Sequence, residues 1–252
     1  MNRYFIYLGY NGKNYNGWQV QPNGITVQAT IEEALAILFR SPVPIVGAGR
    51  TDTGVHARMM VAHFDWHEPL TDLSSLTEKL NRILPKDIAI DKMLPVKEDA
   101  HARFDALSRT YNYYITTRKD PFTYELAYKI HGVLDFDAMN NACEILYDYI
   151  DFTSFSKLHT DVKTNHCRIS HARWEQDGDT WRFSITADRF LRNMVRAIVG
   201  TLIEVGRGKL SIQGFSAIIE AKDRGRAGMS VPGHALFLTD ISYPDELFKV
   251  NK

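Results

Sequence analysis

The spacing of apolar residues alternates along this chain between the two-residue period of strands and the 3.6-residue period of helices. Strand patterns occur at residues 3–12, 57–67, 87–96, 109–116 and 233–243, and helical patterns at residues 26–40, 71–85, 135–150 and 189–206. Two further strand patterns flank Asp177-Gly178, which predicts a hairpin. Strands and helices in alternation, with a hairpin, favour an α+β fold with a mixed, mainly antiparallel sheet over a doubly wound fold.

The helical segments also carry signals for their ends and their buried faces. Thr26 is placed to cap the first helix. In residues 135–150 one apolar stripe contains Met139, Cys143, Leu146 and Ile150. Gly206 suits the C′ position of the helix predicted over residues 189–206, which is the strongest helical signal in the chain.

Domain organisation is suggested by a weak similarity between the two halves of the sequence. Each half begins with a tyrosine-rich strand pattern and later contains a helix. The boundary is expected between Pro95 and Arg103. We therefore predict one α+β domain over residues 1–98 and a second over residues 99–252.

Composition limits the compartment and the classes of protein. The chain has 252 residues, and no apolar run approaches the roughly 20 residues that a membrane-spanning helix needs. The N-terminal residues lack the apolar core of a signal peptide, so a cytoplasmic protein without membrane association is expected. Cys143 and Cys167 lack CxxC spacing, which predicts reduced, buried thiols rather than a disulfide or a zinc site.

Charge is unevenly distributed along the sequence although the formal net charge is zero. A neutral chain taken as a whole weakly disfavours nucleic-acid binding, because phosphate contacts need local positive charge. Residues 189–209, however, contain five bases and one acid, whereas residues 133–151 contain five acids and neither lysine nor arginine. The protein can therefore present a basic face to a polyanion.

The segment GAGRTDTGVHA, residues 47–57, is glycine-rich but matches neither a P-loop nor a dinucleotide-binding motif. Arg50 and Asp52 are two residues apart, so in extended backbone their side chains point to the same side. Spacing alone favours an aspartate that caps its own turn. The alternative is a positioned carboxylate that acts as nucleophile or base, since an aspartate with an unperturbed pKa of about 4 is ionised at neutral pH.

The strand pattern at residues 57–67 predicts one buried face and one polar face. His63, Asp65 and His67 lie on the polar face and could together bind a divalent metal. A solvated strand face is the favoured interpretation, because metal ligands usually come from several elements and no other His or Cys spacing supports a site. No metal is therefore predicted.

Two further groups of residues combine charge with aromatic rings or a helical face. Arg189, Arg192 and Arg196 have the spacing of one stripe on the predicted helix, which is either a solvated face or a set of phosphate ligands. Residues 103–114, RFDALSRTYNYY, interleave arginines with tyrosines. They form either a strand with half-buried tyrosines or a platform on which a nucleobase stacks.

Taken together, six segments resemble those of the A-type tRNA pseudouridine synthases, in the same order and over nearly the whole chain. The segments are YNGKNYNGWQVQ, GAGRTDTGVHA, RFDALSRTYNYY, DFTSF, FLRNMVRAIVG and VPGHALFL. GRTDTGVHA is the most specific of them. Where many relatives have histidine before Met-Val-Arg, this sequence has FLRNMVR, and residues 156–170 are given no role.

The resemblance implies an isomerase that converts uridine to pseudouridine at positions 38–40 of the tRNA anticodon arm without a cofactor. It implies a homodimer whose subunit has two similar halves, a continuous sheet flanked by helices, and an active-site cleft between the halves. Matched position by position, Asp52 is the catalytic residue, Tyr111 packs on the target base, Arg50 helps to open the target site and Arg196 pairs with the aspartate. Arg189 and Arg192 are expected to bind RNA phosphates.

The chemistry agrees with these residue types. An enzyme must take the nucleotide out of the stack before it can break the glycosidic bond, and stacking on an aromatic ring offsets part of the cost. Whether Asp52 attacks C1′, adds to C6 of uracil or removes a sugar proton is left open by the sequence. Two rivals remain: a noncatalytic RNA-binding protein, and a metal-dependent hydrolase built on His63, Asp65 and His67.

Overall fold

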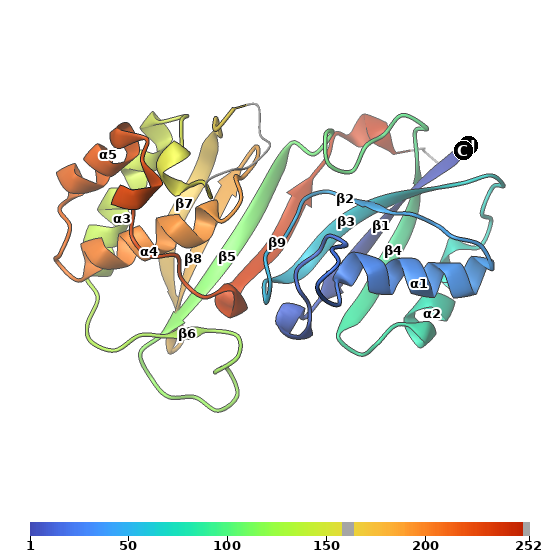
Figure 1. Ribbon diagram of the computed structural model, residues 1–252, viewed down its shortest axis with the longest axis horizontal. Helices are drawn as coiled ribbons and strands as arrows, with labels where there is room; N and C mark the ends of the chain where they lie inside the picture. The colour runs from blue at the N-terminus through green and yellow to red at the C-terminus, as the bar shows by residue number, and fades with distance from the viewer. Residues whose placement is uncertain (158–163, 249–252) are drawn as a thin grey trace. The chain divides into compact units, whose positions relative to one another are not determined.

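The computed structural model describes residues 1–157 and 164–248 (Figure 1). Contacts divide the chain into two compact units, Met1–Leu107 with Leu238–Lys252, and Ser108–Phe237. In each unit helices flank a layer of mainly antiparallel strands, which confirms the predicted α+β class. Part of the segment without an assigned role, residues 158–163, lies outside the described residues.

The first unit is built on β1 (Asn2–Tyr10), which pairs antiparallel with β3 (His56–Trp66) on one side and β4 (Ile88–Val96) on the other. The two-residue β2 (Val46–Gly47) pairs with β3, and β9 (Leu236–Ser242) follows β3 in the strand order. Helices α1 (Val27–Phe39) and α2 (Leu73–Ile83) belong to this unit (Figure 1). The Thr26 side chain accepts a hydrogen bond from the Ala29 N–H at 3.3 Å, as its predicted capping role requires.

Strand β3 is buried on both faces from Met60 to Phe64, so the prediction of a single buried face is wrong. On one face Phe64 contacts an aromatic ring of α1. On the other face His63 Nδ1 accepts a hydrogen bond from the Ala102 N–H at 3.1 Å, and the Tyr243 hydroxyl donates to the Ala102 carbonyl oxygen at 2.6 Å. Segments that are distant in the sequence cover this face. The alternation of polar residues along β3 therefore could not predict that the face is buried.

The second unit is built on β5 (Ser108–Thr116), β8 (Thr180–Ala187) and β7 (Ile169–Asp177), which pair antiparallel in that order. The short β6 (Tyr128–Lys129) pairs parallel with β5. The predicted hairpin is confirmed, but its two loop residues are Gly178 and Asp179, one residue later than expected. Gly178 has φ +59°, a conformation that favours glycine and fixes the position of the turn.

Helices α3 (Phe136–Ile145), α4 (Met194–Gly206) and α5 (Ile212–Ala221) pack together in the second unit (Figure 1). Across both units, the other helical turns of the described residues are 3-10 segments: Gly12–Asn14, Leu146–Asp148, Thr153–Phe155, Arg224–Arg226, Gly233–Ala235 and Asp245–Leu247. Because α3 gives way to a 3-10 turn at Leu146, Ile150 does not continue the predicted stripe and is 53% exposed.

Helix α4 begins at Met194, later than the predicted start at residue 189. Asn193 has φ +67°, a left-handed conformation that an α-helix cannot contain. Arg189 and Arg192 therefore precede the helix and do not form a helical stripe with Arg196. The prediction that Gly206 occupies C′ is also wrong, because Gly206 is the last residue of α4 and packs against α3.

Cys143 and Cys167 are both buried and free, which confirms the prediction of reduced thiols. Burial raises the pKa of both thiols, that of Cys167 to about 12, so they are packing groups rather than nucleophiles. Over the part of the chain that the structure describes, no helix combines the length and the apolar character needed to cross a membrane.

Candidate active site

The loop between β2 and β3 carries Arg50, which is exposed, and Asp52, which is partly exposed. The Val55 N–H donates to the Asp52 carbonyl oxygen at 3.1 Å and closes a four-residue turn. Gly54, the third residue of that turn, has φ +76°. A turn that requires positive φ at its third position explains why glycine follows Asp-Thr in the motif.

A second segment, residues 12–18, holds this loop through its backbone. The Gly54 N–H donates to the Tyr15 carbonyl oxygen, and the Trp18 N–H donates to the Thr51 carbonyl oxygen, each at 3.3 Å. The hydroxyl oxygens of Thr51 and Tyr10 are 2.8 Å apart and share a hydrogen bond. Hydrogen bonds within the first unit thus fix the positions of residues on both sides of Asp52.

Glycines make this close contact possible. A Cβ on Gly17, which has φ +83°, would lie closer than 3.0 Å to the Thr51 carbonyl oxygen, and a Cβ on Gly12 would overlap the Val55 carbonyl oxygen. The sequence predicted that the glycines of the motif serve close approach or a turn. The structure assigns the turn to Gly54 and part of the close approach to glycines of residues 12–18, outside the motif.

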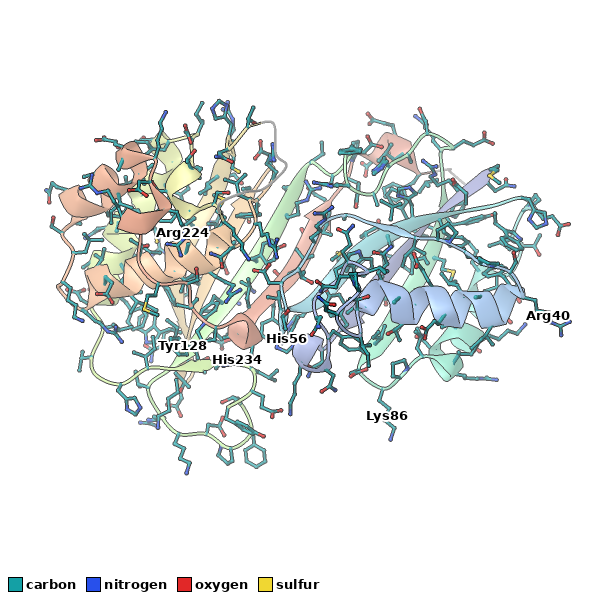
Figure 2. The ribbon with its side chains drawn as sticks, viewed as in Figure 1. Arg40, His56, Lys86, Tyr128, Arg224 and His234 are labelled. Atoms are coloured by element: carbon teal, nitrogen blue, oxygen red, sulfur yellow. The ribbon has the colours of Figure 1, made fainter. Side chains whose placement is uncertain are left out.

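His56, labelled in Figure 2, was not singled out in the sequence, yet its hydrogen bond links the end of the Asp52 loop to residues 12–18. It is buried, and its Nδ1 accepts a hydrogen bond from the Gly12 N–H at 3.0 Å. The one sequence feature that could have identified His56 is its position in the GVHA end of the motif, directly after the loop. Its partner could not be found by sequence reasoning, because Gly12 lies far away in the sequence.

In the second unit, Tyr111 lies in β5 opposite Ile185 and is half-buried. Its ring meets the Phe190 ring edge to face, with centroids 5.1 Å apart and an interplanar angle of 87°. Two residues earlier on the same strand, Arg109 Nη1 donates to the Asp188 carbonyl oxygen at 2.7 Å. Phe190 therefore braces a ring that the sequence proposed as a stacking platform.

Arg196 lies in the first turn of α4, and one residue holds it at two points. Its Nε donates to the Val231 carbonyl oxygen at 2.7 Å, and the Val231 N–H donates to the Arg196 carbonyl oxygen at 3.2 Å. Burial raises the pKa of the Tyr113 hydroxyl, and the positive charge of Arg196 opposes that shift. Arg196 thus acts electrostatically on the β5 residue two positions after Tyr111.

Arg189 and Arg192 lie in the segment that leads into α4. The Arg189 N–H donates to Asp188 Oδ1 at 2.7 Å, and its side chain is half-buried. Arg192 is exposed, and its carbonyl oxygen accepts a hydrogen bond from the Lys157 N–H at 3.0 Å. Both arginines belong to a hydrogen-bonded connection rather than to a helical face.

The group His63, Asp65 and His67 is not arranged as a metal site. His63 Nδ1 is engaged by Ala102, and burial lowers the pKa of His63 to about 4. Asp65 forms a two-point ion pair with Arg3, with distances of 2.7 and 2.8 Å. Within residues 1–157 and 164–248, no group of three His, Cys, Asp or Glu side chains could hold a metal ion. The favoured alternative of a solvated face is wrong for His63, which is buried.

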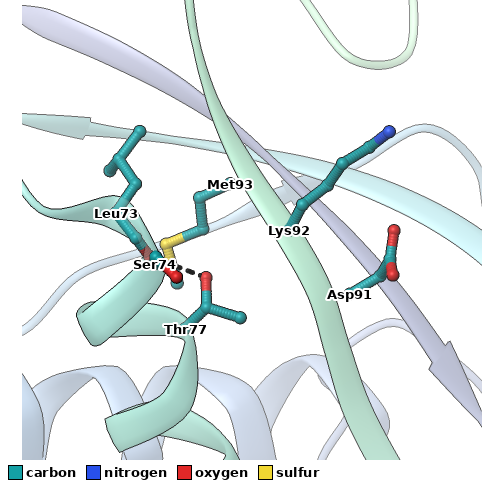
Figure 3. Close-up of a pocket in the computed structure, with 6 residues that line it drawn as sticks. All are labelled: Leu73, Ser74, Thr77, Asp91, Lys92 and Met93. Atoms are coloured by element: carbon teal, nitrogen blue, oxygen red, sulfur yellow. Dashed lines mark hydrogen bonds between the residues drawn. The ribbon is translucent and has the colours of Figure 1, made fainter.

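A pocket in the first unit lies between α2 and β4 and shares no residue with the Asp52 loop (Figure 3). It is lined by Leu73, Ser74, Thr77, Asp91, Lys92 and Met93. The Thr77 hydroxyl donates to the Leu73 carbonyl oxygen at 2.8 Å and so completes a helical contact of α2.

Comparison with known proteins assigns the family. The family model described as "tRNA pseudouridine synthase" matches residues 7–105 and 149–244. The matched segments include Arg50, Asp52 and Arg196, whereas Tyr111 lies between them.

Curated relatives match over nearly the full chain. The chain is 73% identical over 250 residues to "tRNA pseudouridine synthase A" of Parabacteroides distasonis, with 99% of each chain covered. It is 59% identical over 251 residues to the protein of that name from Bacteroides thetaiotaomicron, with 98% of this chain and 93% of the relative covered. For the Bacillus subtilis relative the identity is 40% over 244 residues, with 94% and 97% covered. The chain belongs to the tRNA pseudouridine synthase family.

Proposed function

We propose that this protein isomerises uridine to pseudouridine at positions 38–40 of the tRNA anticodon arm, with Asp52 as the catalytic residue. The observation that carries the proposal is the partly exposed Asp52 on a loop tied by backbone hydrogen bonds to residues 12–18. A carboxylate held on such a loop is oriented before the substrate arrives, as efficient catalysis requires. Family membership and the names of the relatives support the reaction.

The reaction requires the glycosidic C–N bond to break, the base to turn and a C–C bond to form. The target nucleotide has to leave the base stack, which costs a few kcal/mol. Tyr111, braced edge to face by Phe190, offers a ring on which the base can pack. Asp52 then acts at C1′, at C6 of uracil or on a sugar proton.

The arginines take complementary roles in this proposal. Arg196 pairs with Asp52, and Arg50 helps to open the target site. Arg189 and Arg192 bind backbone phosphates of the RNA, for which arginine forks are suited.

The organisation of the protein is part of the proposal. Residues 1–98 and 99–252 are two related halves. The protein acts as a homodimer in the cytoplasm, binds the anticodon stem-loop and needs no cofactor.

The proposal is tested by mapping pseudouridine in tRNA from cells with and without the protein, and from cells that express Asp52→Asn. Pseudouridine at positions 38–40 should disappear in the deletion strain and in the Asp52→Asn strain, and return with the wild-type protein. Unchanged pseudouridine in the deletion strain would contradict the function. If the Asp52→Asn protein restored the modification, Asp52 would not be the catalytic residue.

A further inference from the structure

The loop that follows α5 is shaped from within by Arg224, which lies half-buried near α4 (Figure 2). Its Nη1 donates to the Gly228 carbonyl oxygen at 3.1 Å and to the Ala227 carbonyl oxygen at 3.4 Å. Its Nη2 donates to Ser230 Oγ at 2.8 Å. A planar guanidinium that reaches three acceptors fixes the path of residues 227–230 more firmly than a lysine could.

Ser230 connects this loop to the residue that precedes the first turn of α4. Asn193 Nδ2 donates to Ser230 Oγ at 2.6 Å, while Asn193 has φ +67°. A non-glycine residue in the left-handed region costs about 1 kcal/mol or more and persists where its surroundings hold it. The hydrogen bond to Ser230 ties the Asn193 side chain to the loop at the start of the helix.

Packing prevents the loop from sliding along α4. A Cβ on Gly200 would overlap the Met229 carbonyl oxygen, so the loop backbone lies directly on the helix there. The Gly228 N–H also donates to Thr201 Oγ1 at 2.9 Å. The loop and the first two turns of α4 therefore behave as one body.

Directly after Ser230, the loop reaches Arg196. Val231 accepts from Arg196 Nε and donates its own N–H to the Arg196 carbonyl oxygen. The next residue, Pro232, accepts a hydrogen bond from the Tyr113 hydroxyl at 3.1 Å. The position of the Val231 carbonyl, and with it the direction of the Arg196 guanidinium, depends on the path of the loop.

We propose that Arg224 is a positioning residue for the isomerisation. Through Ser230 it holds both Asn193 and the Val231 carbonyl, and these fix the Arg196 guanidinium. The inference rests on the proposed function, because it assumes that Arg196 acts at the reacting nucleotide. It goes beyond that function by assigning a role to three side chains, Arg224, Ser230 and Asn193, that need not touch the RNA.

The first test compares Arg224→Lys and Ser230→Ala with Arg226→Lys, an exposed arginine in the same 3-10 turn. Steady-state kcat and KM are measured on full-length tRNA. A displacement of catalytic groups by about 1 Å costs about a hundredfold in rate, so we expect a 10- to 100-fold loss of kcat in the first two variants. KM should stay within about threefold, and Arg226→Lys should match the wild type.

The second test observes Arg196 directly by NMR in protein labelled with ¹⁵N-arginine. The Nε–H signal of Arg196 is assigned by its absence in Arg196→Lys. We expect it to be protected from solvent exchange in the wild type and in Arg226→Lys, and to shift or lose protection in Ser230→Ala and Arg224→Lys. Ser230→Thr, which keeps the hydroxyl, should restore both the signal and the rate.

The outcomes separate the inference from the function on which it rests. Normal turnover in Arg196→Lys and Arg196→Ala would refute the proposed role of Arg196 itself. Reduced turnover in those variants, with wild-type kcat in Ser230→Ala, would overturn the positioning role alone. A slower Ser230→Ala with an unchanged Arg196 Nε–H signal would also overturn it. Should Arg224→Lys fail to fold, Ser230→Ala and Ser230→Thr decide the result.

Discussion

Replacing Gly17 by alanine tests whether contacts with residues 12–18 fix the Asp52 loop. Gly17 has φ +83°, and its missing Cβ leaves room for the Thr51 carbonyl oxygen. An added Cβ would also lie 3.2 Å from the carbonyl carbon of Asp52. The substitution therefore presses on the backbone of the candidate catalytic residue without removing any of its atoms.

Two effects set the size of the change. A non-glycine residue at this φ costs about 1–2 kcal/mol. Relief of the overlap requires a shift of roughly 1 Å, and such overpacking costs about 1–3 kcal/mol. The free energy of unfolding should therefore fall by about 2–5 kcal/mol, which corresponds to a decrease in Tm of about 5–15 °C. The same shift at Asp52 should lower kcat by about a hundredfold.

The assay combines thermal unfolding, followed by circular dichroism, with single-turnover pseudouridine formation at a temperature where the variant is folded. Gly49→Ala is the matched control for stability, because Gly49 lies in the same loop, has no positive φ and has nothing within 4 Å of an added Cβ. Its Tm should stay close to that of the wild type. If Gly17→Ala kept the wild-type Tm and kcat, the backbone contact would not be what positions Asp52.

Three other predictions concern packing, pH and salt. Gly200→Ala should lower the Tm by several degrees more than Gly206→Ala, because the first Cβ overlaps a rigid backbone carbonyl and the second meets the flexible Met139 thioether; equal losses would contradict this. Since burial lowers the pKa of His63 from 6.5 to about 4, the unfolded chain takes up a proton first as the pH falls. Stability should therefore decrease between pH 6.5 and pH 4, and the Tm of His63→Asn should change less over that range; the same pH profile in both proteins would argue against it. Arg192→Glu should make the salt dependence of tRNA binding shallower by about one unit of slope, and an unchanged slope would place Arg192 outside the RNA interface.

Local signals explain which parts of the fold could be predicted from the sequence. The Thr26 cap and the hairpin near Gly178 depend on residues close to one another in the chain. The burial of Cys143 follows from its place on the apolar stripe of one helix. In each case the physical cause lies within a few residues, where periodicity and turn chemistry are informative.

The errors arose where distant segments decide the local structure. The helix predicted from residue 189 begins later because Asn193, whose side chain donates a hydrogen bond to Ser230, has a left-handed conformation. The apolar periodicity of the sequence continues through Asn193, so it gives no sign that the helix begins only after this residue. Likewise His63 is buried against Ala102, which follows β4 in the chain and is distant from β3 in the sequence.

In the candidate site, too, the residues of the motif could be predicted, whereas the distant residues that contact it could not. The motif located Asp52 and Arg50, and the turn at Gly54 agrees with its residue types. Gly12, Gly17 and His56 could not be assigned, because their role depends on contacts between residues 12–18 and the loop. The sequence therefore predicts the candidate catalytic residue, and contacts in the fold identify the residues that hold its loop.

The most direct test of the account is single-turnover pseudouridine formation by Asp52→Asn on full-length tRNA, with the tRNA Kd and the Tm measured on the same protein. We predict a fold and a tRNA affinity close to those of the wild type, and a loss of rate of a hundredfold or more, since about that much depends on a positioned catalytic group. A folded Asp52→Asn protein that forms pseudouridine at the wild-type rate would contradict the central claim.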